Sequence, residues 1–353
     1  MRHSDHGSVA RQFLSLEAVG VIGFLLLGAL SLCWMPLNYG KAVASPADAD
    51  PIRDIEPTNE RHDQFAIRYD NRCVLWNARD DRVEPLWLLP GANRVTSIAS
   101  HPTLQWLALA QSDGSLTMYE LSTQRVRWQR IDTSSDATNL QISSDGKHLL
   151  YASSEGELKV YETRNGKHLW TSRLGKSPLL AACFSAVGDR IFTVSQQSGI
   201  VALDIQTGNH IESLPIQCGA PRILHSSPNG RHLAIGTFEG ELIVWNLRSK
   251  AMERRWRPSF FPISALLFTP NQQELFVSNI VGTLARVAID RDSPPVILGR
   301  HADATSSLAT AGSALISACY RGELRVWAGQ TADAPTKKAL YRRSQAISDN
   351  RGV

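Results

Sequence analysis

Apolar and polar residues alternate in short runs along most of the chain, and turn-forming residues separate the runs. Residues 156–161 give one example, because apolar positions there alternate with Glu157 and Lys159. An alternation with a period of two residues is typical of a strand that is buried on one face. The Asn165-Gly166 pair that follows is a typical hairpin turn. The pattern therefore predicts a chain built from short strands and tight turns.

The same pattern returns at a fixed period. One column of large residues marks each copy and comprises Trp76, Tyr119, Tyr161, Leu203, Trp245, Val287 and Trp327. Its successive members are 43, 42, 42, 42, 42 and 40 residues apart. A second column follows at Trp87, Trp128, Trp170, Trp256, Ile297 and Tyr341. Repeats of about 40–45 residues are typical of four-stranded propeller blades. A β-sandwich would not place tryptophan at a fixed phase of the repeat twice, so we predict an all-β fold, a seven-bladed β-propeller.

Small and β-branched residues identify the expected inner strand of most blades. These strands are predicted at residues 95–100, 139–143, 179–184, 222–225, 263–268 and 306–309. Short runs of this composition between Gly, Asp and Ser turns favour strands over helices. The propeller is expected to span residues 64–344, with residues 52–58 as a candidate first strand.

Two sequence motifs resemble the repeats of WD40 proteins. Residues 240–245 and 322–327 each read Gly-Glu-hydrophobic-x-Val-Trp, and Ser227-Pro228-Asn229-Gly230 resembles the Ser-Pro-Asp-Gly turn of that family. The resemblance covers roughly residues 52–344. It implies a propeller that binds other proteins without catalysing a reaction.

The chain departs from the WD40 pattern at both ends of the repeat. The Trp-Asp pair is replaced, for example by Trp327-Ala328, and only Gly299-Arg300-His301 comes near the family's Gly-His opening. The buried Asp-His-Ser-Trp hydrogen-bond network of the family is therefore expected to be absent from most blades. WD40 rings usually place an N-terminal strand in the last blade. Here residues 338–342 fall in phase with the second column, so we expect the last blade to be completed from the C-terminus.

Residues 18–37 differ in composition from the rest of the chain. These 20 residues carry no charge, and as a helix they match the thickness of a bilayer core. We predict a transmembrane helix at Ala18 to Leu37 that acts as a signal anchor, between a tail at residues 1–17 and a linker at residues 38–63. A second tail is expected at residues 345–353. Cleavage as a signal peptide after Ala44 is the alternative, but the apolar run is longer than a signal peptide requires.

Basic residues are balanced around this helix and hardly decide its orientation. Arg2 and Arg11 precede it, and Lys41 and Arg53 follow it. We expect a single-pass membrane protein whose propeller lies on the exported (periplasmic or extracytoplasmic) side. The unpaired cysteines of the propeller argue against an oxidising compartment.

The sequence carries no recognisable catalytic, cofactor or metal motif, and we expect neither an enzyme nor a small-molecule substrate. The net charge of +4 is too small and dispersed to indicate nucleic-acid binding. Asp113, Glu155 and Glu239 occupy the same position of the repeat, in the turn before the glycine. They could bind calcium there, but acidic residues are equally well explained as ordinary turn residues.

Residues 163–170 and 204–208 resemble quinoprotein-type propellers, which implies an alternative function. Such an envelope propeller would bind a small cofactor or assist the assembly of envelope proteins. The dehydrogenases of that group stack their quinone on a disulfide between adjacent cysteines, and this chain has no adjacent cysteine pair. The cofactor-free form of the alternative remains open.

One inter-blade loop stands out as a candidate partner-binding site. Its candidate residues are Arg254, Arg255, Arg257, Phe260 and Phe261. Arginine and aromatic residues are enriched in interface hot spots. Trp256, between them, is expected to pack between blades instead. The turn before each repeat glycine and the loop between blades should share one face of the propeller.

Overall fold

The computed structural model describes residues 41–44 and 50–327, apart from 71, 81, 87–92, 132–135, 196–198 and 292. The predicted membrane segment at 18–37 and both predicted tails lie outside these residues. No helix in the described part has the length and apolar character needed to cross a bilayer.

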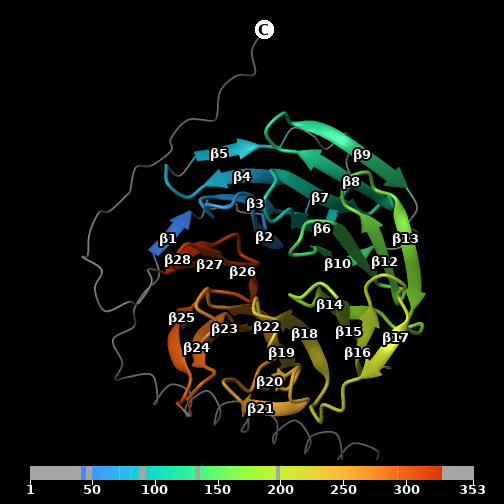
Figure 1. Ribbon diagram of the computed structural model, residues 1–353. Helices are drawn as coiled ribbons and strands as arrows, with labels where there is room; N and C mark the ends of the chain where they lie inside the picture. The colour runs from blue at the N-terminus through green and yellow to red at the C-terminus, as the bar shows by residue number, and fades with distance from the viewer. Residues whose placement is uncertain are drawn as a thin grey trace, which may run out of the picture.

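Strands arranged as seven four-stranded sheets surround a central axis (Figure 1), which confirms the predicted seven-bladed β-propeller. From the inside outwards, the first three blades contain β2 (Asp54–Pro57), β3 (Gln64–Arg68), β4 (Cys73–Asn77) and β5 (Arg82–Pro85); β6 (Val95–Ser100), β7 (Trp106–Gln111), β8 (Ser115–Glu120) and β9 (Arg125–Ile131); and β10 (Ala137–Ile142), β11 (His148–Ser153), β12 (Glu157–Glu162) and β13 (His168–Arg173).

The remaining four blades follow in chain order. They contain β14 (Leu179–Phe184), β15 (Arg190–Ser195), β16 (Gly199–Asp204) and β17 (His210–Ser213); β18 (Pro221–Ser226), β19 (His232–Thr237), β20 (Leu242–Asn246) and β21 (Ala251–Trp256); β22 (Ile263–Phe268), β23 (Glu274–Asn279), β24 (Thr283–Ala288) and β25 (Val296–Arg300); and β26 (Thr305–Ala311), β27 (Ala314–Cys319), β28 (Leu324–Trp327) and β1 (Lys41–Ala44).

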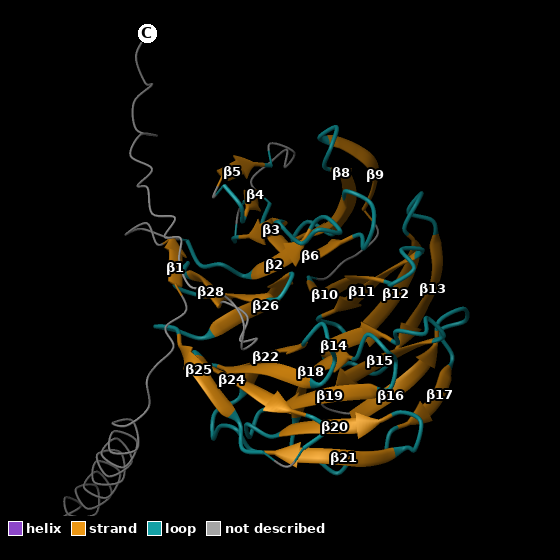
Figure 2. Cartoon of the chain, turned by 60° about the vertical axis from the view of Figure 1, so that its left-hand side comes forward, coloured by secondary structure: helices purple, strands orange, loops and turns teal. Residues whose placement is uncertain are grey.

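The last blade is closed by the N-terminal strand β1, so the expected closure from the C-terminus is wrong. β1 pairs antiparallel with β28, and Lys41, Ala42 and Ala44 lie opposite Val326, Arg325 and Leu324; Figure 2 shows the two strands side by side. Residues 338–342 lie outside the described residues. A strand that follows β28 would extend only its own blade, whereas β1 continues along the chain to β2 and so links blade seven to blade one. Closure by β1 therefore joins the two ends of the ring.

The first sequence column forms the core between neighbouring blades. Tyr119, Tyr161 and Leu203 are at most 2% exposed. Each apolar cluster draws on two adjacent blades; Val160 of β12 and Leu203 of β16, for example, share one cluster. Burial of these side chains between sheets is what holds the blades in register around the ring.

Trp128 and Trp170, two tryptophans of the second column, each bridge to the next blade. The indole Nε1 of Trp128 donates to the carbonyl of Thr163 at 2.9 Å, and that of Trp170 donates to Ile205 at 2.8 Å. Each ring lies over a turn glycine: a Cβ added to Gly166 or Gly208 would lie 2.7 Å from Cδ2 of the tryptophan above it. The column is therefore a repeated contact between the outer strand of one blade and a turn of the next.

Two later blades keep this contact with different chemistry. Glu212 and Arg254 occupy the register position of Trp170, opposite Ala202 and Val244 respectively. The Glu212 carboxylate pairs with Lys250 at 2.6 Å.

Arg254 donates from Nε to the carbonyl of Ile289 at 3.3 Å. Trp256 lies two residues further along, opposite Leu242, so its assignment to the second column is wrong. Its side chain packs partly buried against the core between blades five and six, as expected.

Glu56 is an acidic side chain on an innermost strand. Ser100 Oγ donates to its Oε2 at 3.1 Å. Burial raises the pKa of the Glu56 carboxyl to about 8, and the neighbouring Asp54 acts in the same direction. Burial also raises the pKa of Asp54, against the opposing charge of Arg68. Glu56 therefore keeps its proton at neutral pH, whereas a glutamate in the unfolded chain loses it near pH ~4.3.

Raising the pH from about 6 to about 9 is expected to destabilise the protein, and Glu56→Gln should weaken this dependence. Folded Glu56 holds a proton that the unfolded chain has released, so its contribution is lost as the pH rises through about 8. The midpoint of thermal unfolding, measured across this range, tests the prediction. Glu60→Gln, at an exposed position, is the matched control and should follow the unmodified chain. Parallel curves for all three proteins would contradict the assignment.

Candidate functional site

The turns before the repeat glycines and the loops between blades lie on the same face, as expected. A Cβ on Gly240, in the turn between β19 and β20, would lie 2.7 Å from the carbonyl oxygen of Phe261 in the loop that leads to β22. In the next blade, a Cβ on Gly282 would lie 2.7 Å from the carbonyl oxygen of His301. Only glycine leaves room for this approach, so turn and loop form one continuous surface.

The loop between β21 and β22 presents most of the candidate residues to solvent. Phe260 is 81% exposed and Phe261 is 48% exposed. The Arg257 guanidinium lies over the Phe260 ring, 5.1 Å from its centroid, and its Nε donates to the carbonyl of Glu239 at 3.3 Å. Arg255 donates to the carbonyl of Gln217. These four side chains therefore gather beside the turns and loops of blade five.

Arg254 lies apart from this group. Its bond to Ile289 places it at the interface with blade six, beside the turn that follows β24. Trp256 is also a packing residue. The structure therefore brings together Arg255, Arg257, Phe260 and Phe261, and assigns Arg254 a contact between blades.

Sequence reasoning missed three neighbours that other segments contribute. Phe238, in the turn after β19, is 38% exposed, and Ile280, in the turn after β23, is also 38% exposed. The Arg222 guanidinium lies 5.4 Å from the centroid of the Phe238 ring. Their backbones join the same surface, because Phe238 N donates to Ala220 and Ile280 N donates to Pro262. The sequence did contain a signal for Phe238, because the equivalent turn position is serine in blades two and three.

We call this surface the aromatic–arginine patch, and its members are Arg222, Phe238, Arg255, Arg257, Phe260 and Phe261. Within the described residues its three arginines form no ion pair, and each donates to a backbone carbonyl. The nearby Glu239 carboxylate accepts from Ala220 N at 3.2 Å. That hydrogen bond, helped by the charge of Arg257, lowers the pKa of Glu239.

Blade seven contains a buried hydrogen-bond network that involves His301. Trp327 Nε1 donates to Ser317 Oγ at 2.7 Å, and Ser317 Oγ lies 2.6 Å from His301 Nε2. His301 Nδ1 lies 3.0 Å from Glu323 Oε2. Burial lowers the pKa of His301, and a neutral ring satisfies every contact if Nδ1–H donates to Glu323. This arrangement resembles the buried hydrogen-bond network of WD40 repeats, with a glutamate after the turn glycine where that family has an aspartate before it.

Among the described residues, one group of side chains could hold a metal ion, and it lies at this network. Ligand atoms of His301, Cys319 and Glu323 all lie within 4.8 Å of one another. Both nitrogens of His301 already have hydrogen-bond partners, and Arg325 holds Glu323 Oε1 at 2.6 Å. A cation would have to displace these contacts beside an arginine, so we assign the group a structural role.

The acidic residues of the turn phase serve local contacts as well. Asp113 accepts hydrogen bonds from Asn93 Nδ2 at 2.7 Å and from Ser115 N at 2.9 Å. The Glu239 carboxylate is held by Ala220 N. These bonds are those of ordinary turns and support the turn interpretation over calcium binding.

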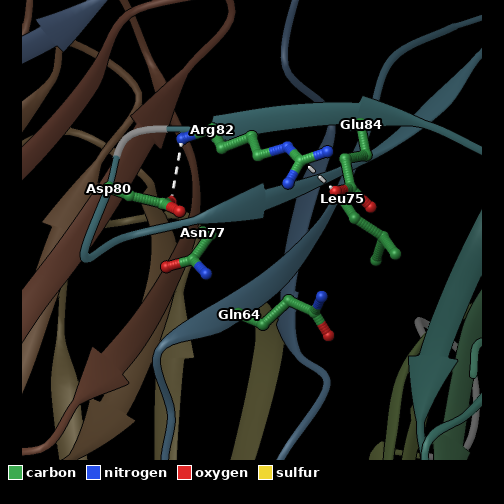
Figure 3. A pocket seen from close by; sticks show the side chains of 6 residues that line it. All are labelled: Gln64, Leu75, Asn77, Asp80, Arg82 and Glu84. Carbon is green, nitrogen blue, oxygen red and sulfur yellow. Dashed lines mark hydrogen bonds and ion pairs between the residues drawn. The ribbon is translucent and has the colours of Figure 1, made fainter.

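A polar hollow lies on the outer part of blade one (Figure 3). Its volume is about 60 Å³, and its lining residues are Gln64, Leu75, Asn77, Asp80, Arg82 and Glu84. Arg82 Nε pairs with Glu84 at 3.1 Å. Pockets for small ligands usually enclose about 300–1,000 Å³, so this hollow has room for one or two water molecules.

Comparisons with known proteins agree with the propeller architecture. The model of the anaphase-promoting complex subunit 4 WD40 domain matches residues 99–226. Mouse DmX-like protein 1 is 20% identical over 230 residues, which is 61% of this chain and 8% of that protein.

Two further relatives are similar over parts of the chain. An uncharacterized WD repeat-containing protein of Synechocystis, sll1491, is 24% identical over 145 residues, 41% of each chain. Pre-mRNA-processing factor 19 of Schizosaccharomyces pombe is 25% identical over 264 residues, 73% of this chain and 49% of that protein. The chain thus spans less than half of the length of each of these relatives.

Proposed function

Because the chain is a WD40-repeat β-propeller, we propose that it acts as a membrane-anchored, non-enzymatic scaffold that binds other proteins through one face. The aromatic–arginine patch is the observation that carries the proposal. Its exposed phenylalanine side chains, which arginines contact, match the composition of interface hot spots. A visible absorbance band in the purified protein would instead favour the cofactor-binding alternative.

Replacing Arg257 and Phe260 together with alanine is expected to weaken partner capture strongly without unfolding the propeller. Phe260 is 81% exposed, so little core packing is lost. Hot-spot truncations each weaken binding by about 2 kcal/mol or more, so the recovery of co-purifying proteins should fall at least about tenfold. Arg125→Ala with Val126→Ala, at exposed positions on β9, is the matched control. Equal recovery with both double variants would remove this patch from the proposal.

Retention of the N-terminal apolar segment is supported by the position of β1. The strand starts at Lys41, four residues after Leu37. Cleavage after Ala44 would remove the whole of β1, whose register with β28 closes the ring. A retained signal anchor would leave the closing strand in place and hold blade seven close to the membrane.

Export of the propeller is compatible with its three buried cysteines. Cys73, Cys183 and Cys319 are buried and free. Burial raises the pKa of both Cys73 and Cys183 to about 12, so these thiols are poor nucleophiles and need no reducing compartment.

The intact mass of the purified protein tests whether the anchor is retained. Protease digestion of cells stripped of their outer layer tests on which side of the membrane the propeller lies. A chain that retains residues 1–44 and is digested from outside is the expected result. A mature chain that starts at Ser45 would contradict the anchor, and a protected propeller would reverse the orientation.

A further inference from the structure

We infer that the aromatic–arginine patch recognises an acidic protein segment that also carries apolar side chains. This inference rests on the proposed function and adds the chemical class of the partner. It combines two properties of the patch: arginines that form no ion pair within the described residues, and exposed aromatic rings in fixed positions.

The arginines of the patch differ from most charged residues of the propeller. Many guanidinium groups elsewhere lie on carboxylates, as in the pairs of Arg190 with Glu212 and Arg325 with Glu323, although Arg254 and Arg300 also donate to backbone carbonyls. In the patch, Arg222 and Arg257 instead donate to the carbonyls of Ile263 and Glu239. A guanidinium that keeps free N–H groups can hold a carboxylate through two parallel hydrogen bonds. The patch can therefore accept several carboxylates of a partner.

The aromatic rings of the patch are held before any partner arrives. Arg257 lies over Phe260 and Arg222 over Phe238. Phe261 N donates to Ser259 Oγ at 2.9 Å, and this hydroxyl accepts from Asn279 Nδ2 at 2.7 Å. A binding loop that is already ordered loses less conformational entropy on association. Apolar side chains of the partner can then pack on exposed rings at little ordering cost.

Arginine and phenylalanine also bind single-stranded nucleic acid, by charge and by stacking. The patch favours a peptide because Glu239 is part of its rim, and its lowered pKa keeps that carboxylate ionised. A fixed negative charge beside Arg257 opposes a continuous phosphate backbone more than a segment with spaced carboxylates. The modest net charge of +4 agrees with this choice.

Fluorescence anisotropy with a labelled synthetic peptide of alternating glutamate and phenylalanine tests the inference on the purified full-length protein. The matched probes are the same peptide with glutamine for glutamate, the same peptide with serine for phenylalanine, and a labelled oligouridine. The glutamate–phenylalanine peptide should bind at least about tenfold more tightly than each of the other three. Its affinity should fall as salt rises from about 50 to about 500 mM, because screening weakens charge pairing.

Variants locate this binding on the patch. Arg257→Gln and Phe260→Ala should each weaken the peptide about tenfold or more, whereas Arg125→Gln on β9 should not. Equal binding of the glutamine peptide, or tighter binding of oligouridine, would overturn the inference. If cellular partners are lost from the Arg257 and Phe260 double variant while the acidic peptide fails to bind, the partner class is wrong and the scaffold function stands. If the double variant also retains its partners, both proposals fail.

Discussion

Gly208→Ala is expected to destabilise the propeller much more than Gly188→Ala. Both glycines are left-handed, with φ of 71° and 75° respectively, so alanine costs about 1–2 kcal/mol at either position. A Cβ on Gly188 meets nothing within 4 Å, whereas one on Gly208 would lie 2.7 Å from Cδ2 of Trp170. Such overpacking adds about 1–3 kcal/mol at Gly208 alone. Urea unfolding of the two variants measures the difference.

A third substitution shows whether the difference comes from the indole ring. Trp170→Leu removes the ring and its hydrogen bond to Ile205, and in that background the two alanine variants should differ by less than about 0.5 kcal/mol. Equal destabilisation of Gly208→Ala and Gly188→Ala with Trp170 in place would show that the ring does not rest on this turn.

The repeat period was sufficient to predict the ring and many of its strands. β6, β14 and β22 have the bounds that the sequence predicts, because each is a short run of small, apolar and β-branched residues. The period works because every blade faces the same constraint: a large side chain must fill the space between two sheets. Trp76 and Trp327, at opposite ends of the column, are both at most 6% exposed.

The repeat is harder to recognise in the sequence where another residue type replaces the tryptophan that contacts the next blade. At the Trp170 position the next blade has Glu212, and the turn that it covers has Lys250 in place of Gly208. The pair preserves the bridge between blades while no aromatic residue marks it. In blade five Arg254 makes the equivalent contact, so Trp256, two residues further along, lies outside the column although it is the nearest tryptophan.

The candidate site was only half visible in the sequence because separate segments build it: strands β18 and β21, the turn after β19 and the loop after β21. Arg257 and Phe260 are near neighbours in the chain, so their composition alone made them candidates. Phe238 and Arg222 come from other segments of blade five. A periodic alignment places them in repeat positions but does not show that they meet. Only the fold brings them to the same surface.

Removal of residues 41–44 is expected to destabilise the whole ring, although the segment is only a four-residue strand. The comparison is between a chain that starts at Lys41 and one that starts at Ser45. The shorter chain loses the pairing of β1 with β28, at about 0.5–1.5 kcal/mol for each backbone hydrogen bond. It also loses the strand through which the N-terminal part of the chain joins blade seven. We expect a loss of roughly 2–4 kcal/mol in urea unfolding.

Addition of the missing strand as a separate peptide keeps this prediction testable if the shorter chain folds poorly. A synthetic peptide that spans residues 38–46 should bind to the chain that starts at Ser45 and restore part of its stability, because β28 otherwise presents an unpaired edge. The same peptide with proline for Ala42, opposite Arg325, should do so less well. Equal stability of the two chains, with no effect of the peptide, would mean that the ring does not depend on β1. The argument that the N-terminal segment is retained in order to keep β1 would then fail as well.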